Sequence, residues 1–264
     1  MLGKPISRIM PARIRELHQT LIPEVLHGQH GAIFGKRIET TIINRDEFEV
    51  PVEIAVTMTR VGDRPEITLF MHDITERKNY ESQLYHISIT DELTGLFNRR
   101  GFITLADKQL KMAHRCDKDA FLLYADFDNM KWINDTHGHP AGDSALVETA
   151  AILTSTFRQA DLIGRVGGDE FIVLMNEPKE RQGEEVVLER LECEISKANS
   201  QPDRKYQILL SIGTVRYDHS EDTGIDELMS RADLLMYENK KQKKALGIDN
   251  YSQEARSAQS RKTT

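Results

Sequence analysis

Two short apolar runs joined by a pair of glycines constrain this chain more than any other feature. Residues 162–166 and 171–175 flank Gly167 and Gly168, and a glycine turn between two such runs is typical of an antiparallel hairpin. Asp169 and Glu170 follow the glycines directly, so the second strand begins with two carboxylates. The pattern predicts a hairpin that presents acidic side chains beside a turn with little steric bulk.

A second acidic motif follows the most apolar stretch of the chain. Residues 121–125 form a continuous apolar run, which is typical of a central strand, and Asp126-Phe127-Asp128 comes directly after it. If the hairpin pairs beside this strand, Asp126 and Asp169 converge on one hard cation. This indicates metal-dependent phosphoryl or nucleotidyl transfer. Taken singly, each motif is equally typical of a solvated loop or an exposed turn.

The remaining periodicity separates the chain into zones. Residues 1–78 contain two strand-like runs, 50–58 and 67–73, which we expect to pair in antiparallel fashion in a small sheet. Residues 75–89 form a helical connector, and residues 88–248 alternate strands with helices over 141–157, 184–198 and 225–244. The polar tail at 252–264 is expected to be disordered. The whole predicts an α+β protein.

The connector helix carries a narrow apolar seam. Tyr80, Leu84 and Ile87 lie at spacings of one and two helical turns. The seam has two interpretations: it packs on its own domain, or it joins two chains in a short parallel coiled coil. The pattern leaves both open.

Net charge and the length of apolar runs limit the classes of partner that this chain can bind. The formal charge of −7 argues against a general nucleic-acid binder, and no apolar run reaches the roughly 18 to 20 residues of a membrane span. We therefore expect no nucleic-acid or membrane partner and a cytoplasmic location. Cys116 and Cys193, whose spacing fits no metal motif, are expected to be reduced and mostly buried thiols.

Six ordered blocks between residues 88 and 248 resemble the GGDEF domain of the diguanylate cyclase family. The blocks are residues 91–100, 126–128, 133–143, 167–171, 211–213 and the closing Ala232-Asp233 with Tyr237 and Lys240. The resemblance implies a central, mainly antiparallel five-stranded sheet flanked by helices, as in nucleotidyl cyclases and polymerase palm domains. It also implies condensation of two GTP molecules into cyclic di-GMP, with GTP as substrate and a homodimer as the active form.

The resemblance assigns the acidic residues. Asp126 and Asp169 match the family's Mg²⁺ ligands, with the Phe127 carbonyl completing the site and Mn²⁺ as an alternative ion. Asp169 and Glu170 match the catalytic acids. Which acid removes the proton from the ribose 3′-hydroxyl stays open.

It also assigns the nucleotide contacts. Asn134 and Asp143 match the positions that hydrogen-bond guanine, and an aspartate suits the two donors of that base. Gly167 and Gly168 let the nucleotide approach the backbone, and Lys240 matches the triphosphate-binding lysine.

The chain departs from the family at Lys244, where arginine is common. Both cations still share one helix face, but lysine loses the bidentate contact to phosphate.

A regulatory site is implied next to the hairpin. Arg158 and Asp161 match the family's Arg-x-x-Asp motif, through which bound product inhibits synthesis. Arg can hydrogen-bond phosphate and the guanine Hoogsteen edge. Arg190 is expected to add a second cation.

The first zone resembles a PAS sensor domain that is incomplete. The carriers are residues 3–6, 10–11, 50–53 and the exit block 73–78. His18 lies where some haem-binding PAS domains hold their iron, but we expect it to be an ordinary helix residue.

Within residues 88–248, we expect Trp132 to pack on the core and assign no ligand role to His137 or His139.

Two other functions compete with catalysis. A receptor would bind cyclic di-GMP through Arg158 and Asp161 without turnover, yet such relatives usually lose acids that this chain keeps at 169 and 170. A scaffold would hold a partner through residues before 78, and its complex would survive Asp169→Ala. A cyclic di-GMP hydrolase is not supported, because no segment large enough for another domain remains.

Overall fold

The computed structural model describes residues 3–16, 34–62, 64–116, 118, 120–176, 183–220 and 223–246. The chain divides into two compact units, Met1–Tyr85 and His86–Thr264, and each is considered by itself. No described helix has the length and apolar character needed to cross a membrane. The expected disordered tail at 252–264 lies outside the described residues.

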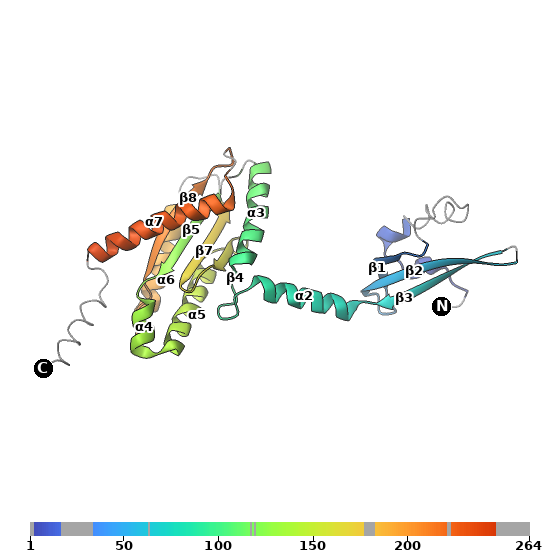
Figure 1. Cartoon of the computed structure of the whole chain (residues 1–264), viewed down its shortest axis with the longest axis horizontal. Helices are drawn as coiled ribbons and strands as arrows, with labels where there is room; N and C mark the ends of the chain where they lie inside the picture. The colour runs from blue at the N-terminus through green and yellow to red at the C-terminus, as the bar shows by residue number, and fades with distance from the viewer. Residues whose placement is uncertain are drawn as a thin grey trace. The chain divides into compact units, whose positions relative to one another are not determined.

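The first unit holds a three-stranded antiparallel sheet in the order β1-β2-β3 (Figure 1). A short 3-10 helix, η1 (Ile6–Ile9), precedes it, and the strands are β1 (Arg37–Ile43), β2 (Glu49–Val61) and β3 (Arg64–Asp73). The predicted pairing of the two strand runs is confirmed, with Val56 opposite Leu69. β1 was not predicted, because Glu39, Thr40 and Thr41 interrupt its apolar alternation.

Helix α2 (Thr75–Ile89) has the bounds expected of the connector. Asp73 precedes its first turn. Hydrogen bonds from the Thr75 side chain and from the Thr75 N–H, the latter at 2.8 Å, lower the pKa of Asp73. The seam residues Tyr80, Leu84 and Ile87 are 63%, 67% and 63% exposed. The interpretation that they pack on their own domain is therefore wrong.

The second unit is built on a five-stranded sheet in the order β4-β6-β7-β5-β8. We expected a mainly antiparallel sheet. The sheet is mixed, because β4 pairs with β6 in parallel whereas the other three pairs are antiparallel. The strands are β4 (Phe97–Asn98), β5 (Ala120–Phe127), β6 (Leu162–Arg165), β7 (Glu170–Asn176) and β8 (Leu210–Tyr217).

Helices cover both faces of this sheet (Figure 1). They are α3 (Arg99–Arg115), α4 (Met130–His137), α5 (His139–Thr156), α6 (Gly183–Asn199) and α7 (Ile225–Ala245). Every residue of β5 is buried, and its side chains alternate between two cores. Leu123 and Phe127 pack towards the α4, α5 and α6 side, while Leu122 and Tyr124 pack towards α3 and α7.

Several predictions of local structure are confirmed. The strand runs on either side of Gly167 and Gly168 pair as an antiparallel hairpin, and the predicted helices lie within two residues of their observed bounds. The final strand of the sheet is Leu210–Tyr217. The cysteines are free, as expected. The expectation that they are mostly buried is wrong, because Cys116 follows the last turn of α3, Cys193 lies on the exposed side of α6, and both side chains are exposed.

Candidate functional site

The acidic residues meet where β5 ends beside the start of β7. Asp126 lies opposite Glu170 in the strand register, and the Phe127 N–H donates to the Asp169 carbonyl oxygen at 2.9 Å. The Asp126 side chain is nearly buried, and burial raises its pKa, as do the nearby charges of Asp169 and Asp128. The structure therefore brings together the residues predicted to hold a metal ion.

Two lysines of α7 balance this negative charge. The Lys240 ammonium donates to the Asp126 carboxylate. Burial lowers the pKa of Lys240, but the hydrogen bond and charge of Asp126 outweigh it and the pKa is raised. Lys243 lies 3.6 Å from the Asp128 carboxylate, whereas Lys244, the predicted second cation, is exposed. The contact of Lys243 was not predicted. Lys243 and Lys244 follow Lys240 by three and four residues, so helix periodicity places either of them near the face of Lys240 and does not distinguish them.

Asp128 has fixed partners next to this cluster. Its carboxylate accepts from the Ser211 hydroxyl at 2.8 and 3.0 Å, and its N–H donates to the Leu209 carbonyl oxygen at 2.8 Å. Asp128 and Ser211 are both buried. This arrangement ties the end of β5 to β8 and leaves Asp126 as the acid nearest Lys240.

The donor set suits a hard cation. Mg²⁺ in nucleotide sites commonly takes one or two carboxylates and completes its shell with phosphate oxygens and water. Asp126 and Asp169 supply two carboxylates. Within the described ranges, no group of three or more His, Cys, Asp or Glu side chains is placed to hold a metal, so such an ion would depend on its substrate for further ligands.

Glu170 is held against the hairpin turn. The Tyr124 hydroxyl donates to Glu170 Oε2 at 3.1 Å, and a Cβ at Gly167 would lie only 2.2 Å from the same oxygen. Burial, followed by the charge of Glu170, raises the pKa of Tyr124, so the phenol stays a donor. A side chain at 167 would therefore displace the Glu170 carboxylate from this position.

A hollow of about 470 Å³ opens beside the hairpin turn. Asn134 and Asp143 line it together with Gly168 and Asp169. Asn134 Oδ1 is buried and has no hydrogen-bond partner among the described residues. A buried acceptor without a donor is costly, so the Asn134 side chain would gain a partner if its amide turned towards a ligand N–H in the hollow. The space over Asn134 depends on Gly142, where a Cβ would lie 2.1 Å from Oδ1.

An ion pair across the domain supports the turn, and no sequence motif indicates it. Arg165 Nη1 lies 3.0 Å from Asp91 Oδ1, and Arg165 Nη2 donates to the Gly168 carbonyl oxygen at 2.6 Å. Burial opposes the ionised form of Asp91, but hydrogen bonds from Thr94 and Arg165 outweigh it and lower its pKa. No periodicity could have connected residues 74 positions apart.

The Asp91–Arg165 pair predicts a pH-dependent stability difference. Because the pKa of Asp91 is lowered on folding, its contribution is present above the unfolded value of about 3.9 and is lost as pH falls through the folded value. Arg165→Met should reduce the free energy of unfolding by roughly 2 kcal/mol at pH 7, a value at the lower end for charged hydrogen bonds because the pair is partly exposed. The reduction should shrink near pH 3.

Urea denaturation at both pH values measures this difference. Asp107→Asn, which breaks the exposed pair with Lys111, is the control and should change stability little at either pH. An Arg165→Met reduction of equal size at pH 7 and pH 3 would contradict the role given to Asp91.

The residues of the predicted regulatory site also lie together. The Arg158 N–H donates to Asp161 Oδ2 at 2.8 Å, and the Asp161 N–H donates to the Arg158 carbonyl oxygen at 2.9 Å. Burial raises the pKa of Asp161, while the charges of Arg158 and Arg190 oppose that rise. The two guanidinium groups are exposed and therefore accessible to a ligand.

The remaining candidates have structural surroundings or lie outside the described residues. Trp132 packs against the core as predicted and meets His137 edge-on, with ring centroids 5.4 Å apart. His139 lines the hollow beside Asn134. His18 lies outside the described residues.

Fold and site together define an α+β domain in which paired carboxylates and a lysine adjoin a hollow of nucleotide size. Comparison with known protein families identifies this one: the family described as "Diguanylate cyclase, GGDEF domain" matches residues 88–245. The chain belongs to the GGDEF diguanylate cyclase family.

A curated relative is the diguanylate cyclase DgcM of Escherichia coli K12, 34% identical over 191 residues, which cover 72% of this chain and 43% of DgcM. The chain thus matches less than half the length of this relative.

Solved structures support the fold. The coiled coil and GGDEF domain of DgcB from Caulobacter crescentus, in complex with c-di-GMP, matches with a TM-score of 0.58 at 24% identity, covering 64% of this chain and 88% of that one. Diguanylate cyclase SiaD from Pseudomonas aeruginosa, in complex with its activator SiaC, matches with a TM-score of 0.54 at 30% identity, covering 63% and 64%.

Proposed function

We propose that this chain is a diguanylate cyclase that condenses two GTP molecules into cyclic di-GMP and releases two pyrophosphates. The observation that carries the proposal is the hollow that joins Asn134 and Asp143 to Gly168 and Asp169, with Asp126 at the adjoining strand end. Membership of the GGDEF family and the similarity to DgcM support the same activity.

Guanine recognition is assigned to the two polar side chains of the hollow. The unpartnered Asn134 Oδ1 can accept from a base N–H, and the Asp143 carboxylate can accept from another. Guanine offers donors at N1 and N2, whereas adenine offers no such pair. Selection of GTP over ATP follows, because adenine would leave buried acceptors unpaired.

The acids are assigned to the reacting end of the nucleotide. Asp126, Asp169 and the Phe127 carbonyl would hold Mg²⁺, or Mn²⁺ in its place. A bound divalent ion polarises the phosphates and neutralises charge that develops on them. Glu170, held by Tyr124, lies next to these ligands and assists removal of the 3′-hydroxyl proton. Lys240 then exchanges Asp126 for a phosphate oxygen.

Catalysis by this arrangement is mostly positioning. One GTP's 3′-hydroxyl attacks the α-phosphorus of the other in line, the new P–O bond forms, and the bond to pyrophosphate breaks. Each domain holds one GTP, so two domains must face each other. We propose that the exposed Tyr80, Leu84 and Ile87 of α2 pair with the same residues of a second chain.

Product analysis tests the activity. GTP and Mg²⁺ are incubated with the protein over a range of protein concentrations, and nucleotides are separated by chromatography. Cyclic di-GMP formed with a specific activity that rises as dimer forms would support both enzyme and dimer. Folded dimer that yields no product but binds cyclic di-GMP would favour the receptor function instead.

Product inhibition is assigned to the cluster of Arg158, Asp161 and Arg190. Arg158→Ala should weaken inhibition by added cyclic di-GMP about tenfold or more, because a charge-assisted contact to phosphate or guanine is lost. Initial rates measured with increasing cyclic di-GMP test this. Arg115→Ala, at the exposed end of α3, is the control. An unchanged inhibition constant in Arg158→Ala would reject the regulatory site.

We further propose that residues 1–78 are a partial PAS sensor that controls the cyclase. The support is the three-stranded antiparallel sheet and its exit at Asp73, whose carboxylate binds the first turn of α2. Glu39 of β1 also contacts Arg77 at 2.7 Å and Lys78 at 2.6 Å. A change in this sheet would therefore act directly on the start of α2.

A further inference from the structure

The outer edge of β8 lacks a neighbouring strand in the described sheet, and side chains take the place of one. The Asn199 amide donates to the Ile208 carbonyl oxygen and accepts from the Ile208 N–H, both at 2.8 Å. Lys243 donates to the Leu210 carbonyl oxygen, and the Ile212 N–H donates to Asn239 Oδ1 at 3.2 Å. Main-chain groups at alternate residues thus bind side chains of α6 and α7.

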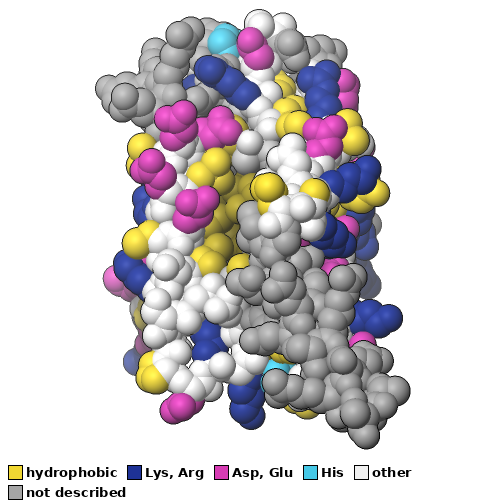
Figure 2. Space-filling model, turned by 90° about the vertical axis from the view of Figure 1, so that its left-hand side faces the viewer, with side chains coloured by type: hydrophobic (Ala, Val, Ile, Leu, Met, Phe, Trp, Pro, Cys, Tyr) yellow, Lys and Arg dark blue, Asp and Glu magenta, His cyan; other side chains and the backbone are white. Residues whose placement is uncertain are grey.

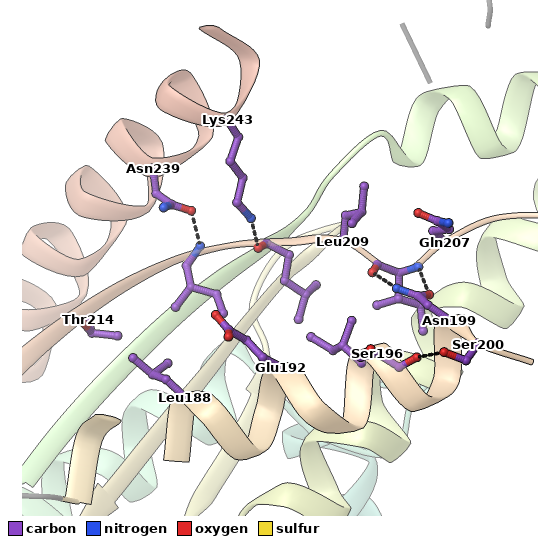
Figure 3. A pocket seen from close by; sticks show the side chains of 14 residues that line it. Leu188, Glu192, Ser196, Asn199, Ser200, Gln207, Leu209, Thr214, Asn239 and Lys243 are labelled. Atoms are coloured by element: carbon purple, nitrogen blue, oxygen red, sulfur yellow. Dashed lines mark hydrogen bonds between the residues drawn. The ribbon is translucent and has the colours of Figure 1, made fainter. Parts of the chain in front are cut away.

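These side chains surround a groove of about 600 Å³ that is separate from the guanine hollow (Figure 3). Leu188 and Ile195 of α6 and Ile212 of β8 give it apolar walls. Figure 3 shows Glu192 and Ser196 on the α6 side and Asn239 and Lys243 on the α7 side. The groove therefore combines an apolar lining with a sheet edge that has hydrogen-bonding capacity.

The α6 side of the groove carries acidic side chains. Glu192 lines it and is exposed, and Glu184 accepts from the hydroxyl of the groove residue Thr214 at 2.9 Å. Helix α6 carries five acidic and two basic residues. On the face shown in Figure 2, hydrophobic side chains line a hollowed region with acidic side chains along one border. The positive charge of Lys243 is already balanced by Asp128.

We propose that this groove binds an extended, basic segment of a partner protein, which adds a strand to the outer edge of β8. The side chains of such a segment that point towards α6 would meet both the apolar lining and the carboxylates of Glu192 and Glu184. A Lys or Arg at these alternate positions can lay its apolar stem on the lining and hold its charge near the carboxylates. Its main chain would replace the bonds of Asn199, Asn239 and Lys243. Each exchange is nearly balanced, since one protein hydrogen bond contributes only about 0.5–1.5 kcal/mol.

The charge favours this occupant over a second copy of the chain. Pairing of β8 with β8 across a two-fold axis would bring two acidic α6 helices towards one another, and like charges oppose such contact. A basic segment instead gains from the same charges. The proposal does not depend on the proposed cyclase activity.

Peptide binding tests the proposal with two synthetic probes. One probe alternates lysine with valine and the other alternates glutamate with valine, and both are capped at their ends. Calorimetry at low salt should show that the lysine probe binds at least about tenfold more tightly. Hydrogen exchange should slow at the amides of Leu210 and Ile212 when the lysine probe is bound.

Matched variants separate the groove from general attraction of cations. Glu192→Lys, at an exposed position, should weaken the lysine probe about tenfold, whereas Glu227→Lys, exposed on α7, should leave it unchanged. A lysine probe methylated at its backbone nitrogens should lose binding. Equal affinity for both probes, no binding, insensitivity to Glu192→Lys, or unchanged exchange would overturn the proposal. If the amides of Leu210 and Ile212 become more protected from exchange as protein concentration is raised without any probe, the proposal is overturned in favour of a second copy of the chain.

Discussion

Replacing Asp169 with asparagine is expected to abolish formation of cyclic di-GMP while the domain stays folded. The change preserves shape but removes one of the two carboxylates at the junction of β5 and β7. The Asp169 main chain, which accepts the hydrogen bond from Phe127, is unaffected. If that carboxylate holds a divalent ion, loss of several kcal/mol of charge stabilisation corresponds to a rate reduction of about a thousandfold or more.

Product assays together with thermal unfolding measure both parts of this expectation. Asp203→Asn removes the same charge from an exposed loop residue, and its positive φ of 61° suits asparagine. This control should synthesise product at the rate of the unchanged protein. Product formation by Asp169→Asn within tenfold of that rate would refute the role given to Asp169. A lower melting temperature would instead indicate a fold defect.

The second large effect concerns the packing of β8 on α7. A Cβ added at Gly213 would lie 2.2 Å from the Ala232 carbonyl oxygen and 2.2 Å from the Met236 nitrogen. Both atoms are main chain, so the helix must move away from the sheet. Gly213→Ala should therefore lower the free energy of unfolding by about 3 kcal/mol. For a domain of this size the melting temperature should fall by roughly 10 °C.

Gly168→Ala provides the matched comparison. A Cβ there meets nothing within 4 Å, and Gly168 is not among the glycines with positive φ. Calorimetric melting should show this variant close to the unchanged protein, although its place in the hollow makes its activity a separate matter. Equal melting temperatures for Gly213→Ala and the unchanged protein would mean that α7 can shift at no cost.

The sequence indicated those parts of the fold that local periodicity and turn chemistry determine. The glycine turn at 167 and 168 predicted the hairpin, and the uninterrupted apolar run predicted β5, because each signal is contained within a dozen residues. The candidate acids followed from their positions at strand ends. Pairing of β5 with β7 then placed Asp126 beside Asp169, as we expected for a hairpin that pairs beside this strand.

What stayed hidden depends on contacts between distant segments. The parallel pairing of β4 with β6 comes from a strand of two residues, too short for a periodic pattern. Arg165 and Asp91 meet where β4, which follows Asp91 in the chain, pairs with β6. Lys243, and not Lys244, contacts Asp128 and the Leu210 carbonyl oxygen because of how α7 packs on β8, which no repeat within the helix encodes.

The contact between Lys240 and Asp126 lets this domain fold without a bound cation. A nearly buried carboxylate without a counter-charge would oppose folding, yet here the chain provides its own ammonium group. A newly made polypeptide can therefore complete its core before it meets a divalent cation. Chelators should accordingly leave the thermal stability of the purified protein unchanged. If a divalent ion serves the reaction, its concentration would govern activity and not the stability of the fold.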